Sequence, residues 1–501
     1  MIFHPWTVTL RHETHAPVDV PSALVYLACA VGVALLTRKR PALGVASLLV
    51  LAPFDLARYV GPTTITTLKA GVAGMLIGLA FSRPDFAVLR TAPVRVMVAA
   101  FCALLAGIAL SAIHAQHLGP VVREAFKNGE YLLLFLAAIL AFATDPDDRP
   151  FWRAQELAVG LVCLSALAEY LFGAHSGIFL HGHAWVVPRI AGVLEGPNQL
   201  SGYLDIALPV LVARALVQRD RALTIAIALA ATTDLLTFSR AGIFGALIGV
   251  AAVTFILRPQ RKLVWRYAAA IALVLALTAA AALRAGVPAG YFSLDQTTQA
   301  GDHLANRSQL WRAALTLWRT SPIVGVGGGN YELDLAEAGL PDVRTHANSL
   351  YLQSLAEGGI VGLATIVALL AATFLTLARS GVRRPLIVGA LGATLALATH
   401  QVFDDMFFFP KVASVYWLVV GIAVAEIAAR RLFEDRRAAS PAAAGASSPK
   451  KSVTGFVSPY RLRITSRISS CAACVTMRIC SSRSRSALGA RIGTPRIVFP
   501  W

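Results

Sequence analysis

Long apolar runs recur along most of the chain and predict a bundle of membrane-spanning helices. A helix needs roughly 20 apolar residues to cross a hydrocarbon core of about 30 Å, because no water there can satisfy its backbone groups. The predicted spans are residues 22–37, 42–58, 63–81, 96–114, 129–144, 154–172, 199–217, 222–238, 240–257, 266–284, 349–377, 385–403 and 412–429. We therefore expect an all-α integral membrane protein with about 12–13 transmembrane helices.

Composition and charge agree with this class. Hydrophobic residues make up 56% of the 501 residues and charged residues only 14%, which is too apolar for a soluble globular chain. The net charge of +18 includes 12 Lys or Arg and no acid after residue 435, so 18 − 12 leaves +6 for the rest. The excess charge therefore belongs to a tail and does not point to nucleic acid. The tail has no apolar periodicity, and we expect it to be disordered and to touch anionic membrane lipids.

The short basic loops predict the orientation, because Lys and Arg beside a span tend to stay in the cytoplasm. These loops lie near residues 38–40, 83–95, 149–153, 219–221, 258–262, 379–384 and 430–431. The first 21 residues are polar, so we expect no cleavable signal peptide. The predicted organisation is a non-cytoplasmic segment at 1–21, a helix bundle at 22–284, an outer loop domain with short helices at 285–348, further spans at 349–431 and a basic cytoplasmic tail at 432–501.

Two arginines at membrane depth are candidate ligands for an anion, because a buried charge is costly and a guanidinium suits phosphate oxygens. Arg189 precedes a predicted helix that starts near Asn198, and the donor-rich start of that helix suits an anion. The alternative is an ordinary turn with a cap. Arg240 lies in a very short turn between two spans. It could instead extend to the membrane surface or pair with Asp234.

The outer loop adds Arg307 and Trp311, which share one face of a predicted amphipathic helix at 305–319, while Arg312 points elsewhere. The glycine run at 325–329 has no following Lys-Ser or Lys-Thr, so a nucleotide loop is not expected. Backbone flexibility, close approach to a ligand or a tight turn explains it better.

His346 is the candidate general base at the start of a span, since its ordinary pKa suits accepting a proton from a hydroxyl. If the helix includes it, His346, Gln353 and Glu357 form one polar stripe. An interfacial histidine without a catalytic role is the alternative.

In combination, these residues resemble the bacterial O-antigen ligase and polymerase superfamily of polytopic glycosyltransferases. The matching elements are Arg189 with Gly192 and Asn198, the turn Thr237-Phe238-Ser239-Arg240, Arg307-x-x-x-Trp311, Pro322 with Gly325-x-Gly327, and the block from His346-Ala347-Asn348-x-x-x-Leu352-Gln353 to Glu357-x-Gly359. The similarity covers residues 180–365 closely.

The resemblance implies a GT-C-like enzyme of the bacterial inner membrane whose site faces the periplasm. Such an enzyme moves a glycan from undecaprenyl diphosphate to an acceptor hydroxyl with inversion and without a metal or other cofactor. Arg240 and Arg307 would stabilise the leaving diphosphate, helped by Arg189, and His346 would orient or deprotonate the hydroxyl. The other substrate-binding candidates are Asn198, Trp311, Asn348, Gln353 and Glu357.

The resemblance leaves the acceptor open among a lipid A core sugar, another glycan and a protein serine. It also leaves a role for the acidic pair Asp404-Asp405 open. A transporter or flippase of a lipid-linked glycan is the competing class. Transporters place their sites near the bilayer midplane in repeated halves, whereas these residues gather at one surface and no repeat is evident.

Overall fold

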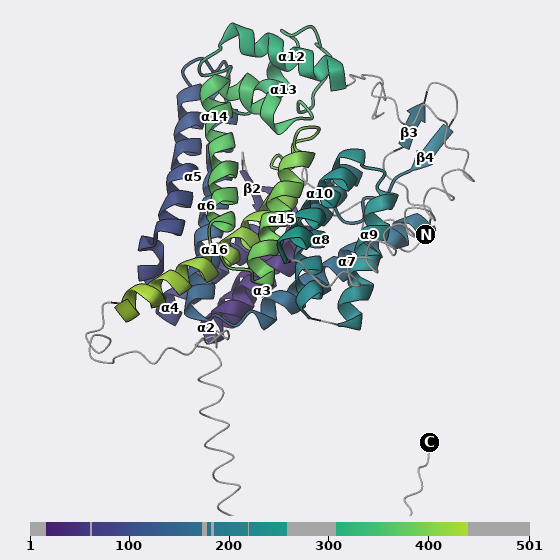
Figure 1. The fold of residues 1–501 in the computed structure, drawn as a ribbon. Coiled ribbons are helices and arrows are strands. Elements are labelled where there is room, and N and C mark those ends of the chain that lie inside the picture. The colour runs from purple at the N-terminus through teal and green to yellow at the C-terminus, as the bar shows by residue number, and fades with distance from the viewer. Residues whose placement is uncertain are drawn as a thin grey trace, which may run out of the picture. The chain divides into compact units, whose positions relative to one another are not determined.

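The computed structural model describes residues 17–60, 63–172, 178–181, 185–218, 220–257 and 307–438, nearly all of them within one compact unit, Met1–Arg437. Helices dominate this part of the chain (Figure 1). The bundle consists of α2 (Val20–Lys39), α3 (Pro41–Leu51), α4 (Thr67–Ser82), α5 (Ala92–Ser111), α6 (Leu118–Thr144), α7 (Arg149–Phe172), α8 (Pro197–Val217), α9 (Arg221–Leu236), α10 (Arg240–Leu257), α14 (Leu350–Ala378), α15 (Pro385–His400) and α16 (Pro410–Ala438).

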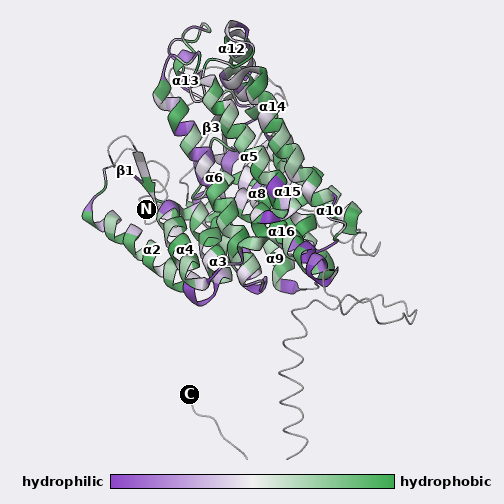
Figure 2. Cartoon of the chain, turned by 90° about the vertical axis from the view of Figure 1, so that its left-hand side faces the viewer, coloured by the Kyte–Doolittle hydropathy of each residue, from purple (hydrophilic) through white to green (hydrophobic). Residues whose placement is uncertain are grey.

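The predicted fold class is confirmed in the described residues. Eight of these helices are long and apolar enough to cross a membrane, and three shorter apolar segments accompany them. Of the predicted spans, 266–284 lies outside the described residues, and each of the others coincides with a helix. As Figure 2 shows, the helices of the bundle are largely hydrophobic, with hydrophilic residues concentrated towards their ends.

Several boundaries differ from the predictions. An antiparallel hairpin of β1 (Ala57–Val60) and β2 (Thr63–Thr66) replaces the ends of two predicted spans, since residues 57–66 are rich in β-branched and aromatic types. Helix α6 begins at Leu118, well before the predicted span, because its first turns are polar and amphipathic. Helix α16 continues to Ala438, past the predicted start of the tail. A second hairpin pairs β3 (Ile178–His181) with β4 (Trp185–Pro188).

Ion pairs bring several of the predicted basic loops to the same end of the bundle. Arg40 pairs with Asp145 and Asp147 at 3.2 and 2.7 Å, which joins the loop after α2 to the loop after α6. Arg436 near the end of α16 pairs with Asp85 at 3.0 Å. These predicted basic loops therefore lie together at one end of the bundle. The side of the membrane on which they lie stays a prediction.

Helices α8 and α16 are the most buried spans, and close contacts between neighbouring helices surround them. A Cβ added at Gly245 of α10 would lie 2.6 Å from the Ala396 carbonyl of α15, and one at Gly249 would lie 2.5 Å from the Gly392 carbonyl. Small residues let the two backbones approach, as is typical of helix pairs in membranes.

Helix α14 contains a break that a loop of the outer segment fills. Gly359 has a φ of +61°, so the helical hydrogen bonds are interrupted there. The Val326 and Gly327 N–H groups donate to the Ala356 and Glu357 carbonyls at 3.0 and 2.9 Å. In return, the N–H groups of residues 360 and 361 donate to the carbonyls of residues 322 and 323 at 2.9 and 3.1 Å. The break thus has no unpaired backbone in these positions.

The break also separates two lengths of helix with different surroundings. Residues 360–378 number 19, which at 1.5 Å per residue gives about 28 Å, close to the thickness of the hydrocarbon core. The nine residues 350–358 then extend beyond that core. They lie with α12 (Arg307–Thr320) and the short α13 (Tyr331–Asp334) at one end of α5, α6 and α14 (Figure 1).

We expect Gly359→Ala to destabilise the protein strongly. The left-handed φ disfavours a side chain, and the new Cβ would lie 2.3 Å from the backbone of Ile323. The free energy of unfolding should fall by roughly 3 kcal/mol. Thermal unfolding of the purified protein in detergent measures this. The matched control is Gly358→Ala, since a Cβ there meets nothing within 4 Å. Equal unfolding temperatures for the two variants would contradict the account of the break.

Candidate functional site

A buried arginine hydrogen bonds to the turn between α9 and α10. Phe238 has a φ of +52°, and the turn is so short that α10 begins at Arg240. Arg189, which is 5% exposed, donates from Nε to the Thr237 carbonyl at 2.6 Å. The same guanidinium donates to the Asn198 side-chain oxygen at 2.7 Å. Arg189 therefore joins the turn to the first turn of α8.

Asn198 bridges Arg189 to a carboxylate and does not cap α8. The N-cap is Gly196, which makes no side-chain cap hydrogen bond, so the prediction that Asn198 starts the helix as a cap is wrong. Its Nδ2 instead donates to Asp404 Oδ2 at 2.6 Å. Its side-chain oxygen, with which a cap would accept from the first turn of the helix, accepts from Arg189 instead.

Asp404 lies at the centre of this cluster, in the loop between α15 and α16. It is 1% exposed, and its Oδ1 accepts from the Asp405 N–H at 2.8 Å. Its Oδ1 also lies 3.8 Å from His346 Nε2. Burial raises the pKa of Asp404, but the positive charges of His346, Arg307 and His400 outweigh burial and hold that pKa below its usual value. The carboxylate therefore stays charged at neutral pH.

His346 lies in the loop before α14 and outside the helix, which begins at Leu350. The stripe predicted for a helix that includes it is therefore wrong for this residue. Its Nδ1 accepts from the Asn348 N–H at 3.1 Å. In the neutral ring this places the proton on Nε2, on the side of Asp404. The Phe408 and Phe409 rings contact the imidazole, with centroids 5.2 and 5.5 Å away.

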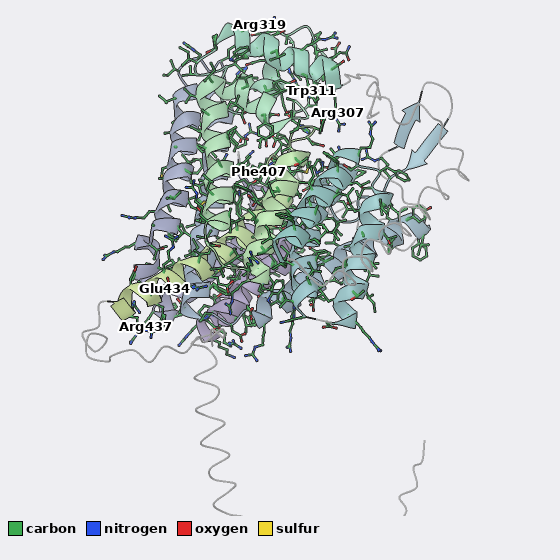
Figure 3. All side chains as sticks on the ribbon, in the orientation of Figure 1. Arg307, Trp311, Arg319, Phe407, Glu434 and Arg437 are labelled. Carbon is green, nitrogen blue, oxygen red and sulfur yellow. The ribbon has the colours of Figure 1, made fainter. Side chains whose placement is uncertain are left out.

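Helix α12 places Arg307 and Trp311 on its side towards the bundle. Figure 3 shows both residues on the side of α12 towards the bundle and Arg319 away from it. The Trp311 Nε1 donates to the Asn348 carbonyl at 3.4 Å, and its ring lies 6.2 Å from that of Phe403. Burial lowers the pKa of Arg307, the negative charge of Asp404 opposes this, and the positive charge of Arg240 lowers it further. Arg312 is exposed, as predicted.

Gln353 and Glu357 lie one helical turn apart on α14, and Gln353 hydrogen bonds to the loop that carries His346. Gln353 accepts from the Ala347 N–H at 2.9 Å and donates to Glu357 at 3.2 Å. Glu357 also accepts from the Tyr331 N–H at 3.4 Å. These two predicted ligands therefore lie away from the arginines and hold the loop on which His346 is placed.

The glycine run at 325–329 packs against the break in α14. A Cβ added at Gly325 would lie 2.3 Å from the Glu357 backbone, and Gly325, Gly327 and Gly329 all have positive φ. The close approach at Gly325 is therefore to the protein's own backbone and not to a ligand, as one of the predicted explanations had it.

Arginines outnumber carboxylates in the cluster around Asp404. Arg189 is linked to Asp404 through Asn198, and the charge of Arg307 acts on Asp404, as that of Arg240 acts on Arg307. Such a site attracts an anion with several charges, such as a diphosphate, because arginine forks bind its oxygens in pairs. Among the residues that the structure describes, no group of three or more His, Cys, Asp or Glu could hold a metal ion.

The described residues therefore form a multi-pass membrane protein with an arginine-rich site at one end of its helix bundle. Residues 225–367 match the family model of the O-antigen ligases. The predicted resemblance to the O-antigen ligase and polymerase superfamily is thus confirmed over this segment, which supports a membrane enzyme that processes lipid-linked glycans. A search of curated proteins found no match. The matched segment contains Arg240, Arg307 and His346, whereas Arg189 and Asn198 precede it.

Asp404 is the central residue that sequence reasoning left without a role, and the only sequence signal was an acidic pair at the end of an apolar span. Its importance becomes visible only when the loop after α15 meets α8 and the histidine loop.

Asn198→Leu keeps the size of the side chain but removes both of its hydrogen bonds. Arg189 and Asp404 would each lose a partner while staying buried. We expect the free energy of unfolding to fall by about 2 kcal/mol, measured as thermal stability in detergent. The exposed Arg312→Ala is the control and should change little. An unchanged stability of Asn198→Leu would show that the bridge does not hold the cluster together.

Proposed function

We propose that this protein is an inner-membrane glycosyltransferase that moves a glycan from undecaprenyl diphosphate to an acceptor hydroxyl, at a site facing the periplasm. The observation that carries the proposal is the convergence of three arginines from α10, α12 and the segment before α8 beside His346 and Asp404. The O-antigen ligase match over residues 225–367 supports the same reaction class.

Arg240 and Arg307 bind the diphosphate and stabilise the charge that develops as it leaves. Fixed positive charges in a poorly hydrated site do this without reorganising during the reaction. Arg189 contributes mainly by position, since two of its five N–H groups donate to the Thr237 carbonyl and to Asn198. In this proposal the arginines take the part that a divalent cation plays elsewhere, and transfer is independent of metal.

The transfer itself is a displacement with inversion at the anomeric carbon. A bond forms from the acceptor oxygen to that carbon, and the bond from the carbon to the phosphate oxygen breaks, so the diphosphate leaves with the electron pair. His346 Nε2–H donates to the acceptor hydroxyl and orients it, because Nδ1 is occupied by the Asn348 N–H. The hydroxyl donates its proton towards the charged Asp404 carboxylate, 3.8 Å from Nε2.

The acceptor is a lipid A core sugar or the end of another glycan. Transfer by purified protein in EDTA, with lipid-linked glycan and either lipid A core or no added acceptor, separates these two. Product on the core would identify a ligase, and longer glycan chains without it would identify a polymerase. Failure to release lipid diphosphate with either would refute the proposed function.

Removing the proposed diphosphate ligands should affect catalysis more than stability. Arg240→Ala and Arg307→Ala should each lower kcat/KM by roughly 10²–10³, and the lysine variants should lose less because they keep the charge. Arg312→Ala, on the same helix but exposed, is the matched control and should stay within about twofold. Equal losses in the control and in Arg307→Ala would count against the assignment.

The division of work between His346 and Asp404 can be tested with amide variants. An amide N–H can replace the imidazole donor, so His346→Gln should keep more activity than His346→Ala. Asp404→Asn cannot accept the proton and should lower kcat by about 10²–10⁴. The opposite order, with His346→Gln inactive and Asp404→Asn active, would make His346 the base.

A further inference from the structure

A cavity lies beside the site, and the proposed mechanism does not use it. Its volume is about 90 Å³, and its walls come from α5, α6, α14, Gly328 and the loop before α16. One water needs at least about 10–15 Å³ of such volume, so this cavity has room for more than one water.

The α6 wall is polar because this helix extends beyond the predicted span. Glu124, Lys127 and Asn128 are three and four residues apart, so they share one face. Lys127 Nζ lies 2.7 Å from Glu124 Oε1, and the two side chains are 19% and 22% exposed. The cavity is therefore polar on this side and reachable from outside.

The opposite wall combines the α14 residues before the break with the loop before α16. Gln353 and Glu357 line it, with Asp405 and Phe408. The Lys127 ammonium lies 5.5 Å from the centre of the Phe408 ring. The lining thus offers carboxylates, amides and an ammonium around an aromatic ring. This set suits a ligand with many hydroxyl groups and one apolar face, which is the chemistry of a sugar ring.

The position of the cavity indicates which substrate would supply that sugar. The Phe408 ring lies near both His346, at 5.2 Å between centroids, and Lys127, at 5.5 Å, so the cavity lies next to the histidine. The arginines lie on the side of Asp404, and Asp405 is the neighbouring residue that faces the cavity. In an inverting displacement the nucleophile approaches opposite to the leaving group. A glycan that presents its hydroxyl at His346 would therefore extend away from the arginines and towards this cavity.

We propose that this cavity is the subsite for a sugar of the acceptor glycan adjacent to the sugar that carries the reacting hydroxyl. The proposal rests on the proposed function, since the direction of attack comes from it. Even without Glu357, whose burial favours its neutral form, the carboxylates Glu124 and Asp405 outnumber the single ammonium of Lys127. A diphosphate would be repelled there, so the two substrates are sorted by charge.

Gly358→Leu tests this directly. Gly358 lines the cavity, and a Cβ there meets nothing within 4 Å, so the added side chain has space at its start and removes volume from the subsite. The control is Gly160→Leu in α7, where a Cβ also meets nothing within 4 Å. In the transfer assay, Gly358→Leu should raise the KM for the acceptor about tenfold. Its KM for the lipid-linked donor should stay near that of the control.

Glu124→Gln provides a second variant that keeps the size of the side chain. It should raise the acceptor KM several-fold without changing the donor KM, because a neutral amide accepts a hydroxyl proton more weakly than a carboxylate. A rise in the donor KM instead, or no change in either constant for both variants, would overturn the subsite.

A binding measurement separates this proposal from the proposed reaction. The probe is the oligosaccharide released from lipopolysaccharide by mild acid, and saturation-transfer NMR detects its contact with the protein in detergent. Wild-type protein should bind it and Gly358→Leu should not, even if no transfer occurs. No binding by wild type would overturn the subsite, whatever the transfer assay shows. A stabilisation by Ca²⁺ that Glu124→Gln removes would identify a cation site instead and overturn it equally.

Discussion

The four backbone hydrogen bonds between residues 322–327 and the break in α14 are the constraint on which the site depends. Unpaired backbone groups beside a membrane are costly, and here a loop from the outer segment satisfies those of a spanning helix. The loop can approach so closely only because Gly325 and Gly359 lack side chains. This contact fixes α12 relative to the bundle, and through α12 it places Arg307 and Trp311 above the loop that carries His346.

Two adjacent carboxyl groups near that contact face different groups. Asp404 joins the arginine side through Asn198 and faces His346, while Asp405, its neighbour in the chain, faces the cavity beside the site. Burial raises the pKa of Asp405 to about 6, even though Lys127 and His346 oppose this, whereas that of Asp404 is held low. Two adjacent carboxyl groups thus differ in pKa because different charges surround them.

Much of the fold was predictable because membrane helices follow directly from apolar length. The arginines, Trp311 and His346 could also be selected, since ionisable residues beside a membrane need a reason. Two of the errors at the site share one physical cause, which is a partner that the local sequence does not specify. Asn198 bonds Asp404 instead of capping α8, and the glycine run meets Glu357 instead of a ligand. Local propensity contains no information on such partners.

The most direct test of the central claim is the affinity of undecaprenyl diphosphate for the protein, measured in EDTA by titration in detergent. The account predicts binding that EDTA leaves unchanged, that undecaprenyl monophosphate does not match, and that a double Arg240→Ala and Arg307→Ala variant loses. Binding that requires a divalent cation, or that survives in the double variant, would contradict the claim that these arginines hold the diphosphate.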